Sequence, residues 1–352
     1  MHRFSARIEL IQESSLNVAR THLDDLTKPR GSMGRLEDVA ARLFAIGQGQ
    51  MPLVVEPAIM LTVAGDHGVA AQKISPAQQA VTRQMVRNFL NGGAAVNALC
   101  RSAGMDLRVV DAGCAGGPFE KHPALLDRRL GDGTDDISLG PAMSREICLK
   151  GLETGVALAE NYAVQGYACI GTGEMGIANS TTAAALYCAL LDIAPEAVAG
   201  PGAGADAAML RRKIAVVRQA LQVNTGLLRE DDPIGALAAL GGFEIVVLCG
   251  IILGAATRRL PVLIDGFICS AAYAAALKIC PAAAGYSFLS HTSAEPGHGP
   301  VLQKLDPDQI PLLSLGMHLG EGTGVAAAYP LVRCAAAMFN DMATFSSAGV
   351  KM

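Results

Sequence analysis

The sequence predicts an α/β fold in which a largely parallel sheet carries helices on both faces. Short apolar or β-branched runs alternate with alanine-rich helical stretches from about residue 58 onward, which is the pattern of βαβ units. Glycine and polar residues follow each run at once. With 352 residues, 51% of them apolar, the chain can also bury a large core. Together these features favour a doubly wound, Rossmann-like arrangement.

The two ends of the chain are helical by pattern. Apolar residues recur at helical spacing over residues 16–26 and again over 36–46, and residues 325–345 form a further helical stretch with Pro330 as a kink or a restart. We expect residues 1–50 and 325–352 to form one smaller, discontinuous helical domain. Residues 51–324 then form the large α/β domain that carries catalysis.

Six apolar runs are the predicted strands, and their near-continuous apolarity fits strands covered on both faces. They occupy residues 58–65, 107–113, 167–173, 260–266, 286–291 and 311–317. The polar loops that follow them are GDHG (65–68), DAG (111–113), GTGEMG (171–176), DG (265–266), SHTSAEPGH (290–298) and LGEGTG (319–324). Because the carboxyl ends of parallel strands share one edge, we expect these loops to converge on one ligand cleft.

Composition excludes several classes of partner. A net charge of −4 without a Lys/Arg cluster argues against nucleic acid, which requires a concentrated basic face. The longest uncharged stretches fall short of the roughly 20 residues of a membrane span, and the N-terminus lacks the apolar block of a signal peptide. Nine cysteines without a CxxC indicate reduced core residues. A cytoplasmic protein with small-molecule partners is therefore expected.

Two glycine-rich segments are candidate phosphate sites. GTGEMG matches GxGxxG and precedes a helix, whose N-terminal amides and dipole suit an anion. A dinucleotide fingerprint also requires an acidic residue about 20 positions on, and Asp192 near that spacing ends a helix-like run. We therefore favour one ribose and one phosphate over a dinucleotide. GPGAG (200–204) is followed by Lys213, which either meets a phosphate or belongs to a solvated helix face.

Other polar residues leave alternatives open. His291, Glu295 and His298 suggest a metal site, but Pro296 and Gly297 prevent the helical His-x-x-x-His geometry, so we expect no metal. Four further residues allow two interpretations each. Asp66 and His67 form an acid/base pair or order their loop, and Asp111 and Asp265 bind ribose hydroxyls or cap the following helix.

Glu321 is the sharpest catalytic candidate. It lies between two glycines in LGEGTG, after an apolar run and before a helix. A carboxylate among apolar neighbours such as Met317 and Leu319 has its proton affinity raised toward that of a useful base. The alternative is a helix N-terminal glutamate that the helix dipole favours.

Several segments together resemble the nicotinate-nucleotide:dimethylbenzimidazole phosphoribosyltransferase family of cobalamin lower-ligand synthesis. The similar segments span nearly the whole chain: KPRGSMGRLE (28–37), AGDHGV (64–69), VTRQMVRNFLNGGAAVNAL (81–99), GTGEMGIANSTTAAAL (171–186), GPGAG, PVLIDGFICSAA (261–272), SHTSAEPGH and LGEGTG. Their number and order make coincidence implausible. One departure is that the family commonly reads PPGSLG where this chain places Arg30 and Met33.

The resemblance implies a defined reaction and a defined set of residues. A nitrogen of 5,6-dimethylbenzimidazole attacks the anomeric carbon of nicotinate mononucleotide, giving α-ribazole 5′-phosphate and nicotinate without a cofactor. By similarity, Glu321 is the general base. The nucleotide site is implied to contain Glu174, Gly176, Lys213, Asp265 and Ser293, and the base slot Ser75, Gln84, Met175 and Leu319. The family also implies a homodimer.

Two other functions compete with this one. A nicotinamide-dinucleotide-dependent oxidoreductase would rest on GTGEMG and Asp192. A non-catalytic nucleotide-binding protein would tolerate the loss of the Glu321 carboxylate.

Overall fold

The computed structural model describes residues 7–202 and 204–350 and contains a six-stranded, wholly parallel sheet. Its strand order is β3-β2-β1-β4-β5-β6, the order of doubly wound dinucleotide-binding folds. The strands are β1 (Ala58–Gly65), β2 (Met105–Gly113), β3 (Leu125–Asp127), β4 (Cys169–Met175), β5 (Val262–Ile264) and β6 (Ser287–Leu289). The predicted fold class is therefore confirmed.

The register brings the ends of the long strands to one edge. Ala58 at the start of β1 pairs with Met105 on one side and Cys169 on the other, and Gly65 at its end pairs with Gly113. The loops that follow β1, β2 and β4 consequently begin side by side. The shared edge was predicted correctly, but of the six loops expected to meet at one cleft, GDHG and DAG supply no residue to the cavity described below.

Two predicted elements at this edge differ in the structure. Residues 311–317 form no strand; Leu313 makes an isolated bridge with His291, and Gly316 at φ 69° turns the chain away. The segment GTGEM, expected as a glycine loop, is instead the body of β4. The three-residue β3 was not predicted, because its length carries no periodic signal.

Helices cover both faces of the sheet, and further helices lie beyond it. They are α1 (Glu13–Asp25), α2 (Arg35–Ile46), α3 (Ala80–Leu90), α4 (Ala95–Ala103), α5 (Arg145–Val164), α6 (Asn179–Leu191), α7 (Pro195–Val198), α8 (Ala207–Val223), α9 (Pro233–Leu240), α10 (Phe243–Thr257), α11 (Phe267–Ile279), α12 (His298–Leu305), α13 (Thr323–Asp341) and α14 (Phe345–Ala348). Short 3₁₀ helices occupy Gly68–Gln72, Thr225–Leu227 and Pro281–Tyr286.

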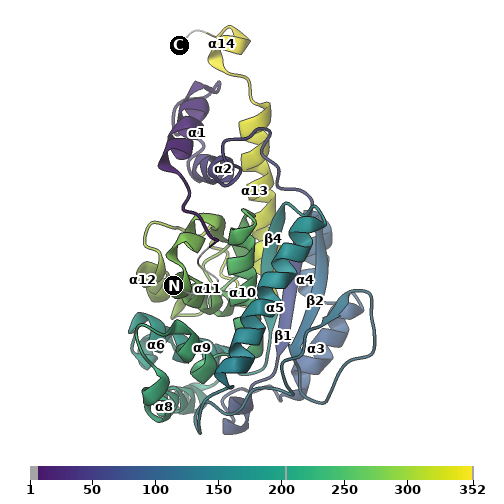
Figure 1. Ribbon diagram of the computed structural model, residues 1–352, viewed down its shortest axis with the longest axis vertical. Helices are drawn as coiled ribbons and strands as arrows, with labels where there is room; N and C mark the ends of the chain where they lie inside the picture. The colour runs from purple at the N-terminus through teal and green to yellow at the C-terminus, as the bar shows by residue number, and fades with distance from the viewer. Residues whose placement is uncertain (1–6, 203, 351–352) are drawn as a thin grey trace.

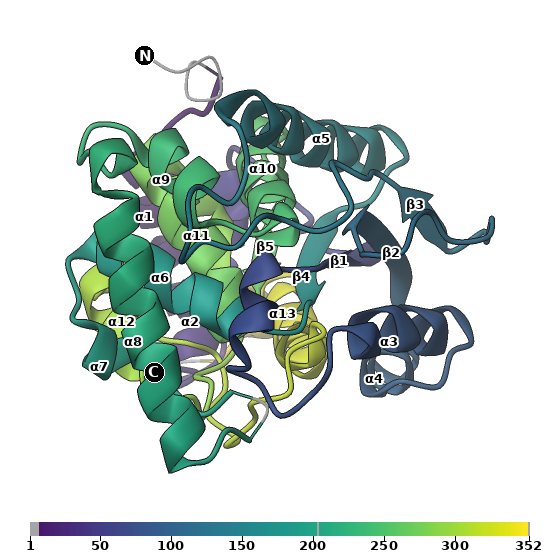
Figure 2. The same ribbon diagram turned by 90° about the horizontal axis from the view of Figure 1, so that it is seen from below.

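The two faces carry different helices (Figure 2). On one side α10 packs directly on the central strands, and α5 packs on α10. On the other side α3, α4 and α13 lie against β1, β2 and β4. The site edge of the sheet is thus held between two helical layers.

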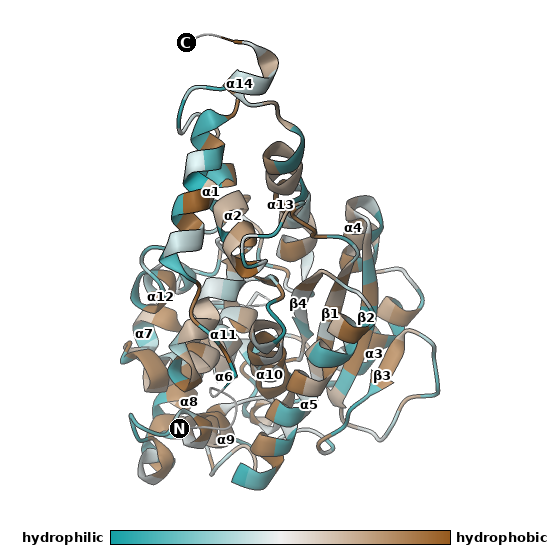
Figure 3. Ribbon diagram, turned by 45° about the horizontal axis from the view of Figure 1, so that its top comes forward, coloured by the Kyte–Doolittle hydropathy of each residue, from teal (hydrophilic) through white to brown (hydrophobic). Residues whose placement is uncertain are grey.

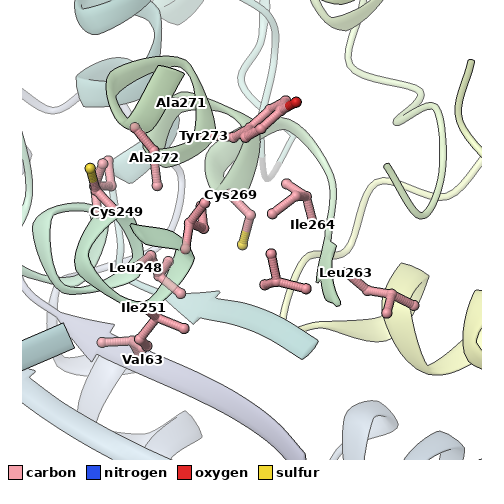
Figure 4. Close-up of a cluster of buried hydrophobic side chains, with 14 of the residues drawn as sticks. Val63, Leu248, Cys249, Ile251, Leu263, Ile264, Cys269, Ala271, Ala272 and Tyr273 are labelled. Carbon is pink, nitrogen blue, oxygen red and sulfur yellow. The ribbon is translucent and has the colours of Figure 1, made fainter. Parts of the chain in front are cut away.

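Helix α10 is buried along almost its whole length and Figure 3 colours it as hydrophobic, whereas α1 carries many hydrophilic residues. Leu248 and Ile251 of α10 lie beside Val63 of β1, and β5 and α11 continue the same cluster (Figure 4). Helices α5 and α10 approach closely because glycines face each other. A Cβ on Gly155 would lie 2.1 Å from the carbonyl oxygen of Val247, so only glycine fits there.

The terminal segments meet beyond the sheet. Helix α2 packs on both α1 and α13, and α13 runs from the sheet up to these helices (Figure 1). Pro330 lies inside α13, which continues through it to Asp341. The predicted division at residue 325 therefore falls within a continuous helix, and the two-domain organisation stays a prediction.

Within the described ranges, no helix has the length and apolarity that crossing a bilayer demands.

Candidate active site

A cavity of about 950 Å³ lies at the carboxyl edge of the sheet. Segments that follow β4, β5 and β6 line it, together with residues 74–76 and 316–321 and with Pro201, Gly202 and Gly204. Nine of the ten predicted site residues are among its walls: Ser75, Glu174, Met175, Gly176, Lys213, Asp265, Ser293, Leu319 and Glu321. Segments far apart in sequence thus reach one site.

Gln84 is the predicted site residue that does not line this cavity. It lies on α3 with an exposed side chain, whereas its neighbour Met85 lines the wall. Successive residues of a helix point about 100° apart. The segment was therefore placed correctly, but the adjacent position faces the cavity.

Glu321 occupies a turn with unusual backbone geometry. Gly320, Glu321 and Gly322 all have positive φ, at 86°, 66° and 98°. Glutamate rarely adopts this region, so neighbours must hold it there. Thr62 of β1 donates a hydrogen bond to the Glu321 carbonyl oxygen at 2.9 Å. Gly173 of β4 lies so close that a Cβ on it would be 2.3 Å from the same oxygen.

The Glu321 carboxylate is buried, with 5% of the residue exposed, and it lines the cavity. Its Oε2 accepts a hydrogen bond from the Val96 amide, at the start of α4, over 3.4 Å. Burial raises the pKa of Glu321, the Val96 amide opposes this shift, and the charge of Asp265 adds to it. A group with a raised pKa binds a proton more readily, as a general base must.

Asp265 follows β5 and accepts hydrogen bonds from the backbone that leads from the Glu321 turn into α13. Its Oδ2 accepts from the Gly322 amide at 3.0 Å, and its Oδ1 accepts from the amides of Gly324 and Val325 at 2.8 and 3.2 Å. The carboxylate therefore caps α13, not the helix that directly follows it. His291 Nε2 lies 3.7 Å from Oδ1. Burial raises the pKa of Asp265, against the opposing effect of His291.

Glu174 is the penultimate residue of β4 and lies beside the same turn. Its Oε2 accepts a hydrogen bond from Asn179 at the start of α6. A Cβ on Gly320 would lie 2.2 Å from its Oε1, so the Glu321 turn packs directly against it. Burial raises the pKa of Glu174 to about 8, and the charges of Asp265, Glu244 and Glu321 contribute. Several buried acids are thus close enough to influence one another.

Lys213 of α8 reaches into the cavity, with 2% of the residue exposed, so it is not part of a solvated helix face. Its Nζ donates to Ser180 Oγ at 2.8 Å and to the Gly200 carbonyl oxygen at 2.9 Å. Burial lowers the pKa of Lys213 to about 8, although Glu295 opposes the shift. The Lys213 ammonium, the start of α6 at Ser180 and the glycines Gly200 and Gly202 meet here. This arrangement suits a phosphate.

The segment SHTSAEPGH forms a wall of the cavity. Ser293 donates its backbone N–H to His298 Nδ1 at 2.8 Å, and His298 Nε2 pairs with Ser270 Oγ at 3.1 Å. Both ring nitrogens are therefore occupied, and burial lowers the pKa of His298 to about 3. Over residues 7–202 and 204–350, no group of three or more His, Cys, Asp or Glu side chains could hold a metal ion.

Three residues with open roles lie outside the cavity walls. Asp111 accepts from the amides of Gly113 and Cys114 at 3.0 and 2.8 Å and from Arg129, so it orders its own loop. Asp66 accepts from the Ala115 amide at 2.8 Å. His67 pairs with Glu244, 2.8 Å away. Asp66 and His67 therefore do not form an acid/base pair with each other at this site.

The part of the cavity that contains the predicted base-slot residues is predominantly apolar. Its sulfur-containing and aliphatic side chains include Met175 and Leu319 together with Met85, Leu99 and Met317. The Ser75 hydroxyl accepts from the Ala77 amide at 3.2 Å, so it forms a local turn. A wall of this kind suits a flat apolar ligand.

Sequence reasoning missed several groups that the structure brings into play. Asn179 hydrogen-bonds Glu174, and Ser180 hydrogen-bonds Lys213. The available sequence signal was that both polar residues stand at the start of the helix that follows β4. The Val96 amide on Glu321 left no side-chain signal. Glu244 was also missed, although a single carboxylate at the start of the otherwise uncharged α10 is a detectable anomaly.

The dinucleotide interpretation loses its structural basis. In doubly wound folds the phosphate fingerprint follows the first strand, whereas here GTGEM lies inside β4. Gly171 and Gly173 serve close packing, since Cβ atoms there would meet Val325 at 2.6 Å and Glu321 at 2.3 Å. Asp192 caps the end of α6 and is not among the cavity residues.

Known proteins resemble this chain over almost its whole length. The nicotinate-nucleotide–dimethylbenzimidazole phosphoribosyltransferase of Nitratidesulfovibrio vulgaris strain DP4 is 56% identical over 343 residues, covering 97% of this chain and 96% of that protein. The enzyme of that name from Solidesulfovibrio magneticus is 52% identical over 345 residues, covering 98% and 97%. The crystal structure of CobT from Thermus thermophilus matches with a TM-score of 0.91 and 41% identity, covering 96% and 99%. A family model described as phosphoribosyltransferase matches residues 8–350. The chain therefore belongs to this phosphoribosyltransferase family.

Proposed function

We propose that this enzyme transfers the 5-phosphoribosyl group of nicotinate mononucleotide to 5,6-dimethylbenzimidazole or a related base, in the assembly of the cobalamin nucleotide loop. The names of its relatives support this activity. One observation carries the proposal. Glu321, which is buried and has a raised pKa, lines the same cavity as Lys213, Gly202 and Gly204. A general base and an anion site thus face the same cavity.

The reaction is a single displacement. One nitrogen of the benzimidazole donates its lone pair to C1′ of the ribose, and the bond from C1′ to the pyridinium nitrogen breaks. The electron pair of that bond returns to the pyridine ring, which leaves as nicotinate. The proton on the other benzimidazole nitrogen passes to Glu321. Attack from the face opposite the leaving group converts the β to the α anomer.

The leaving group explains why a metal is not part of the proposal. Pyridinium nitrogen becomes neutral as it departs, so the leaving group needs neither a proton nor a cation. Catalysis then depends on how the two substrates are positioned and on the general base Glu321.

Each cavity wall has a proposed role. Lys213, Gly176 and Ser293 hold the phosphate, and Glu174 binds a ribose hydroxyl. Ser75, Met175 and Leu319 form the slot for the base. For Asp265 we propose positioning in place of ribose binding, because both of its oxygens already accept backbone amides.

Substitution of the general base Glu321 tests the function. Purified protein is incubated with nicotinate mononucleotide and a panel of benzimidazoles, adenine and phenols, and free nicotinate is measured. The Glu321→Gln variant should bind both substrates almost normally, while turnover falls by roughly 10² to 10⁴. Wild-type protein that releases no nicotinate with any base, or a variant with full turnover, would refute the proposal.

We further propose a cytoplasmic homodimer, from similarity to the family. The nine cysteines, all within the described residues, are free thiols, which supports a reducing compartment. Sedimentation equilibrium of the full chain tests the dimer, and a mass of one chain would contradict it.

A further inference from the structure

Two buried ionisable side chains outside the cavity have no part in the displacement. His67 follows β1, and Glu244 lies in the first turn of α10. His67 is 1% exposed and Glu244 is 0% exposed. Burying such groups costs free energy unless they are paired, so their retention calls for a physical reason.

Both nitrogens of the His67 ring have partners. Nε2 lies 2.8 Å from Glu244 Oε1, and Nδ1 lies 3.1 Å from Thr182 Oγ1 in the first turn of α6. Burial alone would lower the pKa of His67, but Glu244 and Asp66 outweigh it and the net shift is upward. A protonated ring donates from both nitrogens, and a neutral ring can donate to Glu244 and accept from Thr182, so in either state the ring links α10 to α6.

The ring also supports the turn between β4 and α6. A Cβ on Gly176 would lie 3.0 Å from His67 Nε2 and 2.4 Å from the Gly65 carbonyl oxygen, so the turn rests directly on the ring and on β1. The next residues reach α6 through Ala178 at φ 76°, a conformation that alanine rarely adopts without support. The Ile177 amide donates to Thr82 Oγ1 at 3.1 Å.

The far side of this turn faces the cavity. Gly176, Asn179 and Ser180 line the wall where Lys213 enters. The His67 ring therefore lies directly behind the backbone that meets the phosphate in the proposed function. A small movement of the ring would shift those amides relative to Lys213.

We propose that the His67–Glu244 pair, through Thr182, is a positioning device that fixes the turn at residues 176–180 for binding of the substrate phosphate. This inference rests on the proposed function. It predicts that damage to the pair weakens recognition of the phosphate specifically. Binding of the nicotinate ring and of the attacking base should stay intact, because the pair acts on the phosphate-binding turn at residues 176–180.

Paired substitutions at Thr182 provide the sharpest test. Thr182→Val removes the hydroxyl with little change in volume, and Thr182→Ser retains it. Glu244→Gln removes the charge of the pair directly. Tyr329→Phe is the matched control, since it deletes another buried hydrogen bond, to the Val55 carbonyl oxygen, on α13. Each variant is compared with wild type for its unfolding midpoint, its KM for nicotinate mononucleotide, its kcat and its inhibition constant for nicotinate riboside, which lacks the phosphate.

For Thr182→Val and Glu244→Gln we expect KM for the mononucleotide to rise about 10-fold, the worth of one to two hydrogen bonds. The kcat should change less than about 3-fold and the riboside constant less than about 2-fold, while Thr182→Ser restores KM. Equal weakening of mononucleotide and riboside, or a Tyr329→Phe variant with the same selective loss, would overturn the positioning role. If Glu244→Gln does not fold, the Thr182 pair decides alone. Wild-type protein that releases no nicotinate would refute the proposed function and this inference with it.

Discussion

Replacement of Gly173 by alanine should damage catalysis from a position that touches no substrate. Gly173 lies in β4, and a Cβ there would be 2.3 Å from the Glu321 carbonyl oxygen, 2.7 Å from its carbonyl carbon and 2.9 Å from the Gly322 nitrogen. All three are backbone atoms, which cannot rotate aside as a side chain can. The Glu321 turn must therefore move as a unit.

The size of that movement follows from the contact distance. Ordinary van der Waals contact begins at 3.4 Å, so the turn must retreat by about 1 Å, at a cost of about 1 to 3 kcal/mol in the free energy of unfolding. A displacement of about 1 Å at a reacting group lowers the rate on the order of 10²-fold. We expect kcat of Gly173→Ala to fall by about that factor, with substrate affinities changed much less.

Steady-state rates of nicotinate release and urea denaturation measure the two effects. Gly171→Ala is the matched comparison, because the added Cβ in the same strand would meet side chains, Val325 at 2.6 Å and two methionines. Gly140→Ala, with nothing within 4 Å, controls for loss of backbone entropy. A Gly173→Ala protein with wild-type kcat and stability would show that the turn is not held by β4.

Three further perturbations address other walls of the site. Lys213→Met should raise KM for nicotinate mononucleotide about 10- to 100-fold, the worth of a charged hydrogen bond; an unchanged KM in initial-rate assays would contradict a phosphate role. In the wild type, kcat/KM should decline as the pH rises through about 8, because Lys213 then loses its charge, and Lys213→Met should lack this decline. Asp265→Asn should lower the free energy of unfolding by about 1 to 3 kcal/mol and reduce kcat more than affinity, since an amide group would face the α13 amides; equal kcat in the variant would argue against positioning. On the acid side, kcat should decrease as the pH falls through a pKa above the ordinary glutamate value, because only the carboxylate accepts a proton. A pH–rate profile that is identical in Glu321→Gln would remove Glu321 from this role.

Much of the sheet edge that carries the site could be predicted from the sequence. Near-continuous apolar runs predicted five of the strands. Four of the six polar loops that follow the runs supply residues to the cavity, and nine of the ten named residues line it. Such signals are local, so they can be recognised without knowing which segments pack against each strand. The errors were local too: Gln84 was chosen where Met85 faces the cavity, because the sequence sets the helix but not the angle at which it packs.

What the sequence determined by itself was the class of fold, the edge that carries the site and the residue types gathered there. Only the tertiary structure decided what each of these residues contacts. Asp265 accepts from amides 57 to 60 positions away, Glu244 pairs with His67 at a separation of 177, and Gly173 is glycine because Glu321 lies against it. Periodicity records which face of an element is buried, whereas contacts across such separations depend on how the elements pack, and no local pattern encodes them.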